Sequence, residues 1–235
     1  MSGILYVCAT PIGNLDDVSL RLLATLREAD AVLAEDTRHT GKLLARHEIR
    51  VPLVSCHQHT HPDKIRALAQ RLESGESLAL VTDAGTPGIS DPGMPLVRAA
   101  AELGVTVSPI PGACALAAAL CVSGFDAQRF SFLGFLPRKP GKRRKALEES
   151  LARSETLILY ESPHRVVATL KDLAALAPSR AVAACRELTK KFEEVKRGNA
   201  VGLAEFFAAQ KEVRGEFVLV IGGESQAKKD APDDE

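Results

Sequence analysis

The sequence predicts an α/β fold built as two domains. Short apolar runs alternate with segments in which apolar residues recur every three or four positions, as expected for strands that alternate with helices. Most of the apolar runs end in Gly/Pro-rich or polar turns. The alternation breaks near residue 123 and then starts again. Hydrophobic residues make up 46% of the 235 residues, which is enough for two cores.

The first half contains five apolar runs with the length of strands. They cover residues 4–9, 31–34, 53–55, 78–81 and 105–109. A helix follows Ser19, which is a suitable N-cap, because Leu20, Leu23 and Leu26 share one helical face. Further helices are expected after Pro62, over 96–103 and over 113–122. The polar cluster E-D-T-R-H-T at 35–40 directly follows a strand, which is typical of a site.

The second half repeats the pattern after the turn at 123–129. Strands are expected at 130–135, 156–160, 181–185, 193–196 and 216–221, with helices at 142–153, after 162–165 and at 201–209. The strand at 216–221 is nearly all apolar, so we expect it to be central. We therefore predict an N-terminal domain at 1–122 and a C-terminal domain at 123–224, followed by a disordered tail at 225–235 that is too polar to pack.

Composition excludes several classes of protein. Basic and acidic residues number 30 each, so net charge does not indicate a partner. The five cysteines are scattered without a C-x-x-C, which favours reduced thiols and a cytoplasmic location. No signal peptide is expected, because the first residues lack a basic region followed by an apolar stretch. The most apolar run, at 113–122, is far shorter than the ~20 residues of a membrane span, so no membrane partner is expected.

Two common nucleotide-binding motifs are missing. No G-x-G-x-x-G follows the first strand, so a Rossmann dinucleotide site loses its main support. The segment P-G-K-R at 140–143 lacks the upstream glycine and the following Ser or Thr of a phosphate loop. These absences argue against a dehydrogenase and against a kinase or NTPase.

Three histidines alternate at His57, His59 and His61. On a strand they would point to one face and could hold a metal, with Asp36 and Asp83 completing the site. Alternatively they are polar loop residues that bind substrate or water. We favour the second interpretation and expect no metal, because a metal site also needs outer-shell support that a sequence does not show.

The segment V-T-D-A-G-T-P-G-I-S-D-P-G at 81–93 has the composition of a binding loop. Its glycines at 85, 88 and 93 permit positive φ and close approach of the backbone to a ligand, while its prolines restrict it. It follows a strand of an α/β pattern, and open α/β sheets bind ligands at the carboxyl ends of their strands. An ordinary connection made of turn residues is the alternative.

Basic residues cluster in the second half. Six cations occupy eight positions, namely Arg138, Lys139, Lys142, Arg143, Arg144 and Lys145. Such a cluster favours a polyanion such as nucleic acid, and the alternative is a solvated helix face balanced by Glu148 and Glu149. A second set, diluted by acids, contains Arg186, Lys190, Lys191, Lys196 and Arg197.

Several motifs, taken together and in order, resemble a known family. They are T-P-I-G-N at 10–14, A-E-D-T-R-H-T-G at 34–41, the loop at 81–93, I-P-G-A at 110–113, G-F-L-P-R-K at 134–139, Y-E-S-P-H-R at 160–165 and R-E-L-T-K at 186–190. They are similar to those of the tetrapyrrole methylase superfamily, the class III SAM-dependent methyltransferases, and within it to bacterial enzymes that methylate ribosomal RNA. The resemblance extends from about Leu5 to Gly223.

This resemblance implies a function. It implies a homodimer that binds S-adenosyl-L-methionine in a cleft between two α/β domains and methylates the 2′-oxygen of a cytidine in the decoding region of 16S rRNA, within the small ribosomal subunit. No DNA partner is expected. The implied cofactor-binding residues are Pro11, Gly13, Asp83, Gly85, Thr86, Pro87, Ile89, Pro111, Gly112, Cys114, Ala115, Tyr160, Glu161 and Leu188.

The catalytic and RNA-binding residues follow from the chemistry of the transfer. Most of the rate can come from holding the ribose oxygen in line with the methyl group, and a base would assist. The candidate bases are Asp36, His57, Glu161 and Glu187, with Arg38 and Arg165 as clamps on phosphate or ribose. The RNA-binding candidates are the six cations at 138–145 together with Arg165 and Lys190.

Three alternative functions remain open from the sequence. A methylase of the same superfamily could act on a tetrapyrrole, another small substrate or a protein side chain. A metal-dependent hydrolase could use His57, His59 and His61. The third alternative is a protein that binds RNA without catalysis, which would show no binding of S-adenosyl-L-methionine.

Overall fold

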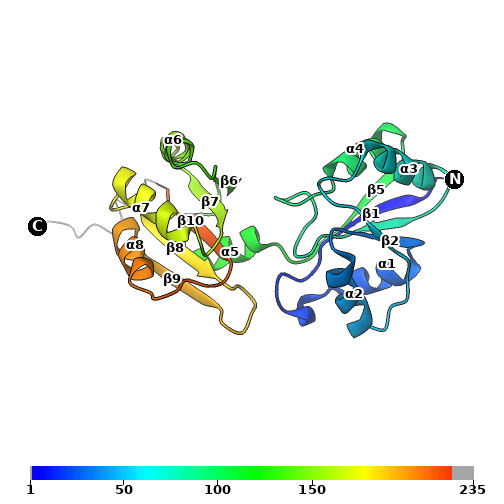
Figure 1. The fold of residues 1–235 in the computed structure, drawn as a ribbon, viewed down its shortest axis with the longest axis horizontal. Helices are drawn as coiled ribbons and strands as arrows, with labels where there is room; N and C mark the ends of the chain where they lie inside the picture. Colours follow the sequence, from blue (N-terminus) through cyan, green and yellow to red (C-terminus); the bar gives the residue numbers. More distant parts are fainter. Residues whose placement is uncertain (1, 224–235) are drawn as a thin grey trace, which may run out of the picture. The chain divides into compact units, whose positions relative to one another are not determined.

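The computed structural model describes residues 2–223 and divides the chain after Cys114 into two compact units. Unit 1 covers residues 1–114 and unit 2 covers 115–235. The predicted tail at 225–235 lies outside the described residues. Each unit is an α/β structure with its own sheet (Figure 1), so the predicted fold class is confirmed.

Unit 1 contains a parallel sheet in the order β3-β2-β4-β1-β5. Its strands are β1 (Ile4–Cys8), β2 (Ala31–Ala34), β3 (Leu53–Ser55), β4 (Leu78–Leu80) and β5 (Thr106–Ile110). Because all five strands run the same way, all of their carboxyl ends lie at one edge of the sheet.

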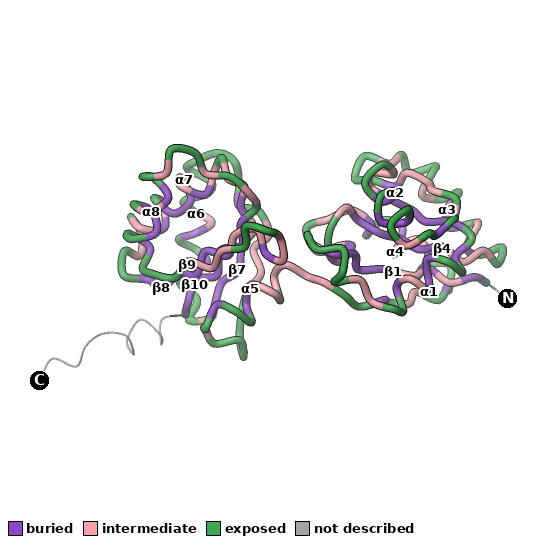
Figure 2. The backbone as a smooth tube through the Cα atoms, turned by 90° about the horizontal axis from the view of Figure 1, so that it is seen from below, coloured by how far each residue is buried: buried purple, intermediate pink, exposed green. Residues whose placement is uncertain are grey.

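Helices cover both faces of this sheet. They are α1 (Leu20–Glu28), α2 (Thr37–Arg46), α3 (Pro62–Glu73) and α4 (Met94–Glu102), and a short 3-10 helix lies at Leu15–Asp17. Alternate strand residues face opposite sides. Leu33 and Leu78 pack in a core with Leu72 of α3, whereas Val32 packs in a second core with Leu26 of α1. Figure 2 shows the strands as the buried centre of the unit.

Unit 2 contains a mixed sheet in the order β6-β7-β10-β8-β9. Its strands are β6 (Phe130–Phe135), β7 (Thr156–Glu161), β8 (Ala181–Arg186), β9 (Glu194–Asn199) and β10 (Phe217–Ile221). β6 and β7 are parallel, whereas β10 is antiparallel to both β7 and β8. Strand β10 is central and buried at every residue, as predicted from its apolar sequence.

The helices of unit 2 pack on both faces of this sheet. They are α5 (Ala115–Ser123), α6 (Pro140–Leu151), α7 (Val166–Leu176) and α8 (Ala200–Ala208). Residues of α6, α7 and α8, such as Leu147, Leu170 and Phe207, share one core with Leu219 of β10. Helix α5 instead packs against the sheet near Cys185, whose Sγ lies 3.9 Å from the Ala119 carbonyl oxygen. The unit boundary therefore precedes α5, whereas the predicted boundary, after residue 122, follows most of this helix.

Two further features bear on the predictions. Helix α2 was not predicted, because its Thr-Arg-His-Thr start reads as a polar turn; its N-cap is Asp36, whose carboxylate accepts the Arg38 backbone N–H. All five cysteines are free, as expected from their spacing. No helix within residues 2–223 has the length and apolar character required to cross a membrane.

Candidate functional site: the loops at the strand ends of each unit

Three Gly/Pro-rich loops follow β1, β4 and β5, which are neighbours in the sheet of unit 1. The first two are joined by a pair of backbone hydrogen bonds, Thr10 N–H to Gly85 O (2.9 Å) and Gly85 N–H to Thr10 O (3.1 Å). The second and third are joined by the Thr86 hydroxyl, which donates to the Ala113 carbonyl oxygen at 3.1 Å. The loops therefore form one connected backbone surface at the carboxyl edge of the sheet.

Two glycines make this close arrangement possible. Gly85 has φ of +83°, and a Cβ there would lie 3.3 Å from Cγ2 of Ile12. At Gly112 a Cβ would lie 3.1 Å from Cβ of Ala9 and 3.2 Å from its carbonyl oxygen. A side chain at either position would push the loops apart, so both glycines are needed for the geometry.

The other cofactor-binding candidates of unit 1 lie on the same loops. Pro11 and Pro87 are buried, and Gly13 and Pro111 are exposed. Ile89 is held in a turn by its N–H, which donates to the Thr86 carbonyl oxygen at 3.3 Å. Cys114 is half-buried at the end of the third loop. The structure thus brings together residues that are about 100 positions apart in the sequence.

Acidic side chains gather beside these loops, at the ends of β2 and β4. Oδ1 of Asp83 accepts the backbone N–H of Asp36 at 3.0 Å, which joins the two strand ends. Burial, followed by the charge of Asp83, raises the pKa of Glu35. Burial, followed by the charges of Glu35 and Asp83, raises the pKa of Asp91 to about 6. Glu35 and Asp91 were not among the predicted site residues, although they lie in the motif at 34–41 and in the loop at 81–93.

Asp36 is engaged by Arg38. Its Oδ1 accepts Arg38 N–H (2.8 Å) and Nε–H (3.1 Å), and its Oδ2 accepts Nη2–H (2.7 Å). These bonds, the side-chain ones foremost, hold the pKa of Asp36 well below its usual range. The Arg38 side chain is 90% exposed, so its guanidinium remains open to solvent on the far side of this pair.

The three histidines do not share a strand face, which corrects the geometry on which the metal hypothesis depended. β3 ends at Ser55, residues 57–60 form a turn, and His61 is the N-cap of α3. The His57 and His59 rings meet edge-on with centroids 6.3 Å apart. Within residues 2–223 no group of three His, Cys, Asp or Glu side chains is arranged to hold a metal ion.

His57 instead lines a small cavity of about 160 Å³ in unit 1. Asp91, Thr60 and Met94 also line it. The His59 N–H donates to Nδ1 of His57 at 3.2 Å, so neutral His57 carries its proton on Nε2 and offers a donor there. This arrangement favours a binding role over that of a base.

In unit 2, the predicted cofactor-binding residues lie at the ends of β7 and β8 and at the start of α5. Tyr160 Oη accepts the Leu116 N–H at 3.1 Å, and its ring packs edge-on against Phe132 and Phe135. Ala115 is the first residue of α5, and Leu188 is buried in the loop after β8. These contacts fix Tyr160 at the end of β7.

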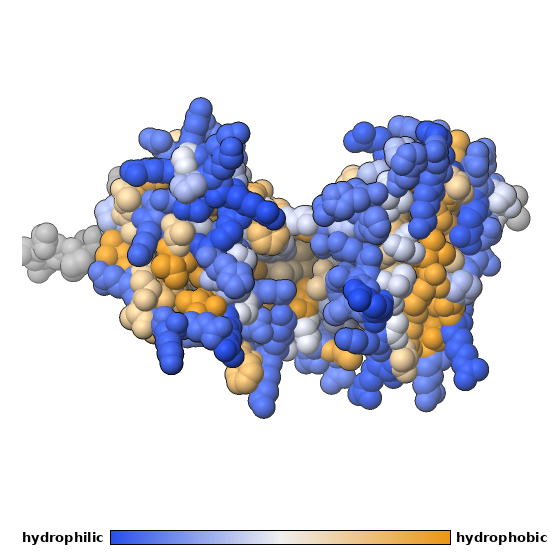
Figure 3. All heavy atoms as spheres, viewed as in Figure 1, coloured by the Kyte–Doolittle hydropathy of each residue, from blue (hydrophilic) through white to orange (hydrophobic). Residues whose placement is uncertain are grey.

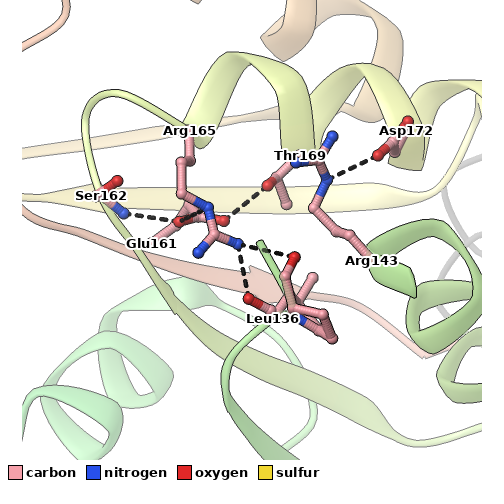
Figure 4. A network of polar contacts seen from close by, with 8 residues as sticks. Leu136, Arg143, Glu161, Ser162, Arg165, Thr169 and Asp172 are labelled. Atoms are coloured by element: carbon pink, nitrogen blue, oxygen red, sulfur yellow. Dashed lines mark hydrogen bonds and ion pairs between the residues drawn. The ribbon is translucent and has the colours of Figure 1, made fainter. Parts of the chain in front are cut away.

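Glu161 is buried in a polar network, shown in Figure 4. Its carboxylate accepts the Ser162 N–H (2.9 Å) and the Thr169 hydroxyl (2.7 Å), and lies 3.3 Å from Nε of Arg165. Nη2 of Arg165 donates in turn to the Leu136 carbonyl oxygen at 2.7 Å. The carboxylate of Glu161 is thus occupied within unit 2, and Arg165 is tied to the start of the basic segment.

The basic segment 138–145 divides into exposed and buried members. Arg143 is buried, and its Nε donates to Oδ2 of Asp172 on α7 at 2.7 Å (Figure 4). This corrects the expectation that Arg143 contacts RNA, because its guanidinium joins α6 to α7. Arg138, Lys139, Lys142, Arg144 and Lys145 are exposed. Figure 3 shows hydrophilic side chains gathered over α6.

Lys190 and Glu187 hold the loop between β8 and β9. Nζ of Lys190 lies 3.0 Å from Oε1 of Glu187 and 2.8 Å from Oε2 of Glu216. Although burial opposes the shift, these carboxylates raise the pKa of Lys190. Burial likewise opposes the shift at Glu187, but the Glu216 N–H and Lys190 lower its pKa. Both side chains therefore serve the loop, and Glu187 is a poor proton acceptor.

Comparison with known proteins identifies the family. The sequence model described as Tetrapyrrole (Corrin/Porphyrin) Methylases matches residues 4–204. The chain belongs to this family. The prediction made from the motifs is thereby confirmed.

Tetrapyrrole methylase family members of known name share much of this sequence. The chain is 48% identical over 224 residues to ribosomal RNA small subunit methyltransferase I of Halalkalibacterium halodurans, which covers 95% of this chain and 77% of that protein. It is 49% identical over 223 residues to the protein of the same name from Xylella fastidiosa, with 94% and 82% covered. The fold of uroporphyrin-III C-methyltransferase from Thermus thermophilus, solved with S-adenyl homocysteine, matches with a TM-score of 0.64 at 20% identity and covers 94% of this chain and 97% of that one.

Proposed function

We propose that this tetrapyrrole methylase family member transfers the methyl group of S-adenosyl-L-methionine to the 2′-oxygen of a cytidine in the decoding region of 16S rRNA. The substrate is the small ribosomal subunit, and a cytoplasmic location follows from that substrate. The homodimer implied by the sequence motifs is part of this proposal, and sedimentation of the purified protein tests it.

The connected loops of unit 1 are the observation that carries this proposal. Thr10, Gly85, Thr86 and Ala113 join three loops at the carboxyl ends of neighbouring parallel strands, where α/β sheets bind ligands. Relatives 43–49% identical to the chain are named ribosomal RNA small subunit methyltransferase I. The position and the names together support a methyltransferase with RNA as its substrate.

The residues at these loops fit the cofactor. Backbone N–H and C=O groups held close by Gly85 and Gly112 can bind the adenine and the methionine ends. The acids Glu35, Asp83 and Asp91 suit a ligand that carries a positive sulfonium. When bound, S-adenosyl-L-methionine supplies an activated methyl group on sulfur.

This chain contributes orientation more than base strength. A ribose hydroxyl loses its proton as its oxygen forms the new bond to carbon, so a base with a pKa near neutrality assists most. Asp36 is held ionised by Arg38, and Glu187 by Lys190, so neither accepts a proton readily. Asp91, with its raised pKa, is better suited to act as a base. The charge of Glu35 contributes to that raised pKa. We assign Arg38 to binding of a phosphate or ribose.

The direct test is methyl transfer from labelled S-adenosyl-L-methionine to small subunits that lack the modification. The subunits are then digested to nucleosides, which shows whether the label is on a base or on a ribose. Label on the 2′-oxygen of one cytidine is the expected result. Label on a base would contradict the proposed atom, and no transfer to RNA would contradict the proposed substrate.

A tetrapyrrole substrate is the second candidate, because the family description names such substrates. The same labelled cofactor, offered with a porphyrinoid in place of subunits, distinguishes the two. The exposed cations of the basic segment favour RNA, since cations spread along a segment match the row of phosphates of an RNA strand better than one compact porphyrinoid.

A further inference from the structure

We propose that the exposed ring of Phe192 stacks on an unpaired nucleobase of the RNA substrate, and that the loop after β8 is built to present it. This inference rests on the proposed function, because it names a contact to the same RNA. Phe192 is 70% exposed, more than any other phenylalanine within residues 2–223. Three features of unit 2 lead to the proposal.

The first feature is the position of the loop on the sheet. Phe217, at the start of β10, pairs with Glu161 at the end of β7 and with Arg186 at the end of β8. Phe135, at the end of β6, pairs with Tyr160. The basic segment after β6 and the loop after β8 therefore leave the sheet at the same end of its strands.

The second feature is the rigidity of the loop. Glu187 and Thr189 have positive φ, 49° and 66°, which non-glycine residues adopt only when their surroundings hold them there. Lys190 bridges Glu187 and Glu216, and the Thr189 N–H donates to Oε2 of Glu193 at 2.6 Å. Leu188 is buried beneath the loop. Little entropy would be lost when this loop bound a partner.

The third feature is the chemistry of the tip. Lys191 and Phe192 are exposed, and Nζ of Lys191 lies 5.6 Å from the ring centroid. The acids nearby have partners: Glu187 and Glu216 pair with Lys190, Glu194 lies 3.6 Å from Arg186, and Glu193, which is exposed, accepts the Thr189 N–H. An aromatic ring beside an exposed ammonium is how proteins bind unpaired bases and the adjoining phosphate.

The same edge carries a second exposed aromatic side chain, Phe135, which is 56% exposed and precedes Arg138 and Lys139. Strands β6 and β9 are the two edge strands of the sheet, four interstrand spacings or about 19 Å apart. An RNA strand that runs across the strand ends from β6 to β9 would meet an aromatic ring and a cation on both sides of the sheet. Phe135 and Phe192 would therefore contact two different bases that are well separated along the RNA.

The test compares Phe192→Ala with Phe130→Ala. Phe130 is also exposed, at 42%, but it lies at the start of β6, where it pairs with Thr156, and therefore at the opposite end of the strands. We expect Phe192→Ala to raise the KM for small subunits about tenfold, with the affinity for S-adenosyl-L-methionine unchanged. Phe130→Ala should change neither. Equal KM values for Phe192→Ala and the wild-type protein would overturn the proposal.

A fluorescence measurement gives an independent readout. The chain has no tryptophan, so Phe192→Trp introduces a single reporter that keeps an aromatic face. We expect this variant to retain methyl transfer and its emission to be quenched by an unstructured RNA oligonucleotide, while emission from Phe130→Trp is unchanged. Emission that varies with protein concentration and not with RNA would show that a second copy of the chain covers the ring, which would overturn the proposal.

The two proposals fail in different ways. If wild-type protein transfers no methyl group to small subunits, the proposed function fails, whatever the fluorescence shows. If transfer occurs and Phe192→Ala leaves KM unchanged, the function stands and the stacking contact fails.

Discussion

The two sheets of this protein have five strands each but differ in strand direction and in the side chains at the ends of their strands. The sheet of unit 1 is parallel throughout, so four neighbouring strands, β2, β4, β1 and β5, send their loops to one edge, where glycines and acids gather. The sheet of unit 2 is mixed, and the loops at the edge that holds Tyr160 and Arg186 carry cations and exposed aromatic rings. Acids suit a sulfonium cofactor, and cations suit RNA.

Within unit 2, similar residues of one sequence cluster have different tasks. Arg143 is buried against Asp172, whereas Arg144 beside it is exposed. Helical geometry explains the difference, because adjacent residues on α6 point about 100° apart. A cluster of charged residues in a sequence therefore forms a charged surface only through those of its members whose side chains are exposed in the fold.

The largest expected effect is loss of stability in unit 2 on Arg143→Ala. The variant leaves Asp172 without its partner, and the Arg143 side chain is only 8% exposed. We expect the free energy of unfolding to fall by about 3 kcal/mol. Urea denaturation measures it. Arg144→Ala is the matched control and should unfold as the wild-type protein does; an equally stable Arg143→Ala would show that the ion pair does not hold α6 to α7.

Asp83→Ala should affect unit 1 in its binding rather than its folding. The variant removes a carboxylate from the loop edge and the acceptor for the Asp36 N–H. We expect affinity for S-adenosyl-L-methionine, measured by calorimetry, to fall tenfold to a hundredfold, or about 1.4–2.7 kcal/mol.

Asp83→Asn separates charge from hydrogen bonding. Its side-chain oxygen can still accept the Asp36 N–H, so a loss of affinity in this variant reports the charge alone. Unchanged affinity in both variants would contradict the assignment of the acidic loop edge to the cofactor.

Asp91 should make the stability of unit 1 depend on pH. Folding raises the pKa of Asp91 from its ordinary value of 3.8 to about 6, foremost through burial. The folded state therefore holds the proton more tightly, so this contribution to stability is complete below pH 3.8 and is lost as the pH rises through about 6. Because Asp91 is only partly buried, we expect Asp91→Asn to stabilise the protein at pH 7 by on the order of 1 kcal/mol.

Thermal unfolding of wild-type protein and Asp91→Asn between pH 4 and pH 8 checks this. The difference between the two should grow with pH and level off above pH 7. A difference that shrinks as the pH rises would have the wrong sign for a raised carboxyl pKa.

The smallest expected effect concerns the exposed cations of unit 2. Replacing Lys142 or Arg144 with Gln removes one phosphate contact at most, so affinity for small subunits should fall only a few-fold. The slope of log affinity against log salt concentration should become shallower by about 1 for each cation removed. An unchanged slope for every exposed cation of the segment would place the RNA elsewhere.

The sequence predicted more of the fold than of the site. Ser19 is the N-cap of α1, and β10 is the central strand, both as expected, because capping and apolar runs are local signals. Helix α2 was not predicted because its first turn is polar, and because its N-cap, Asp36, belongs to a polar cluster that was interpreted as part of a site. The histidines at 57–61 alternate as on a strand, yet β3 ends before them.

The site was predicted by motif rather than by geometry. Composition marked the loop at 81–93 as a candidate binding loop, and the resemblance supplied a ligand for it. Asp91, the second acid of that loop, was not among the predicted site residues, because its raised pKa comes foremost from burial and then from the charges of Glu35 and Asp83, and a sequence shows neither the burial nor the distances. Arg143 was included among the predicted RNA contacts because a sequence does not show which residue of a basic cluster becomes buried when another element packs against its helix.

The sequence by itself therefore determined the two α/β units and the family, since each of these depends on local pattern or on motifs in order. Only the tertiary structure decided which charged side chains serve the fold and which remain free. Glu161, Arg165, Glu187 and Lys190 are bound within unit 2, whereas Lys191 stays exposed. The reason is physical: the pKa and the availability of a charged group are set by its partners in space, and a sequence does not show which partners folding brings together.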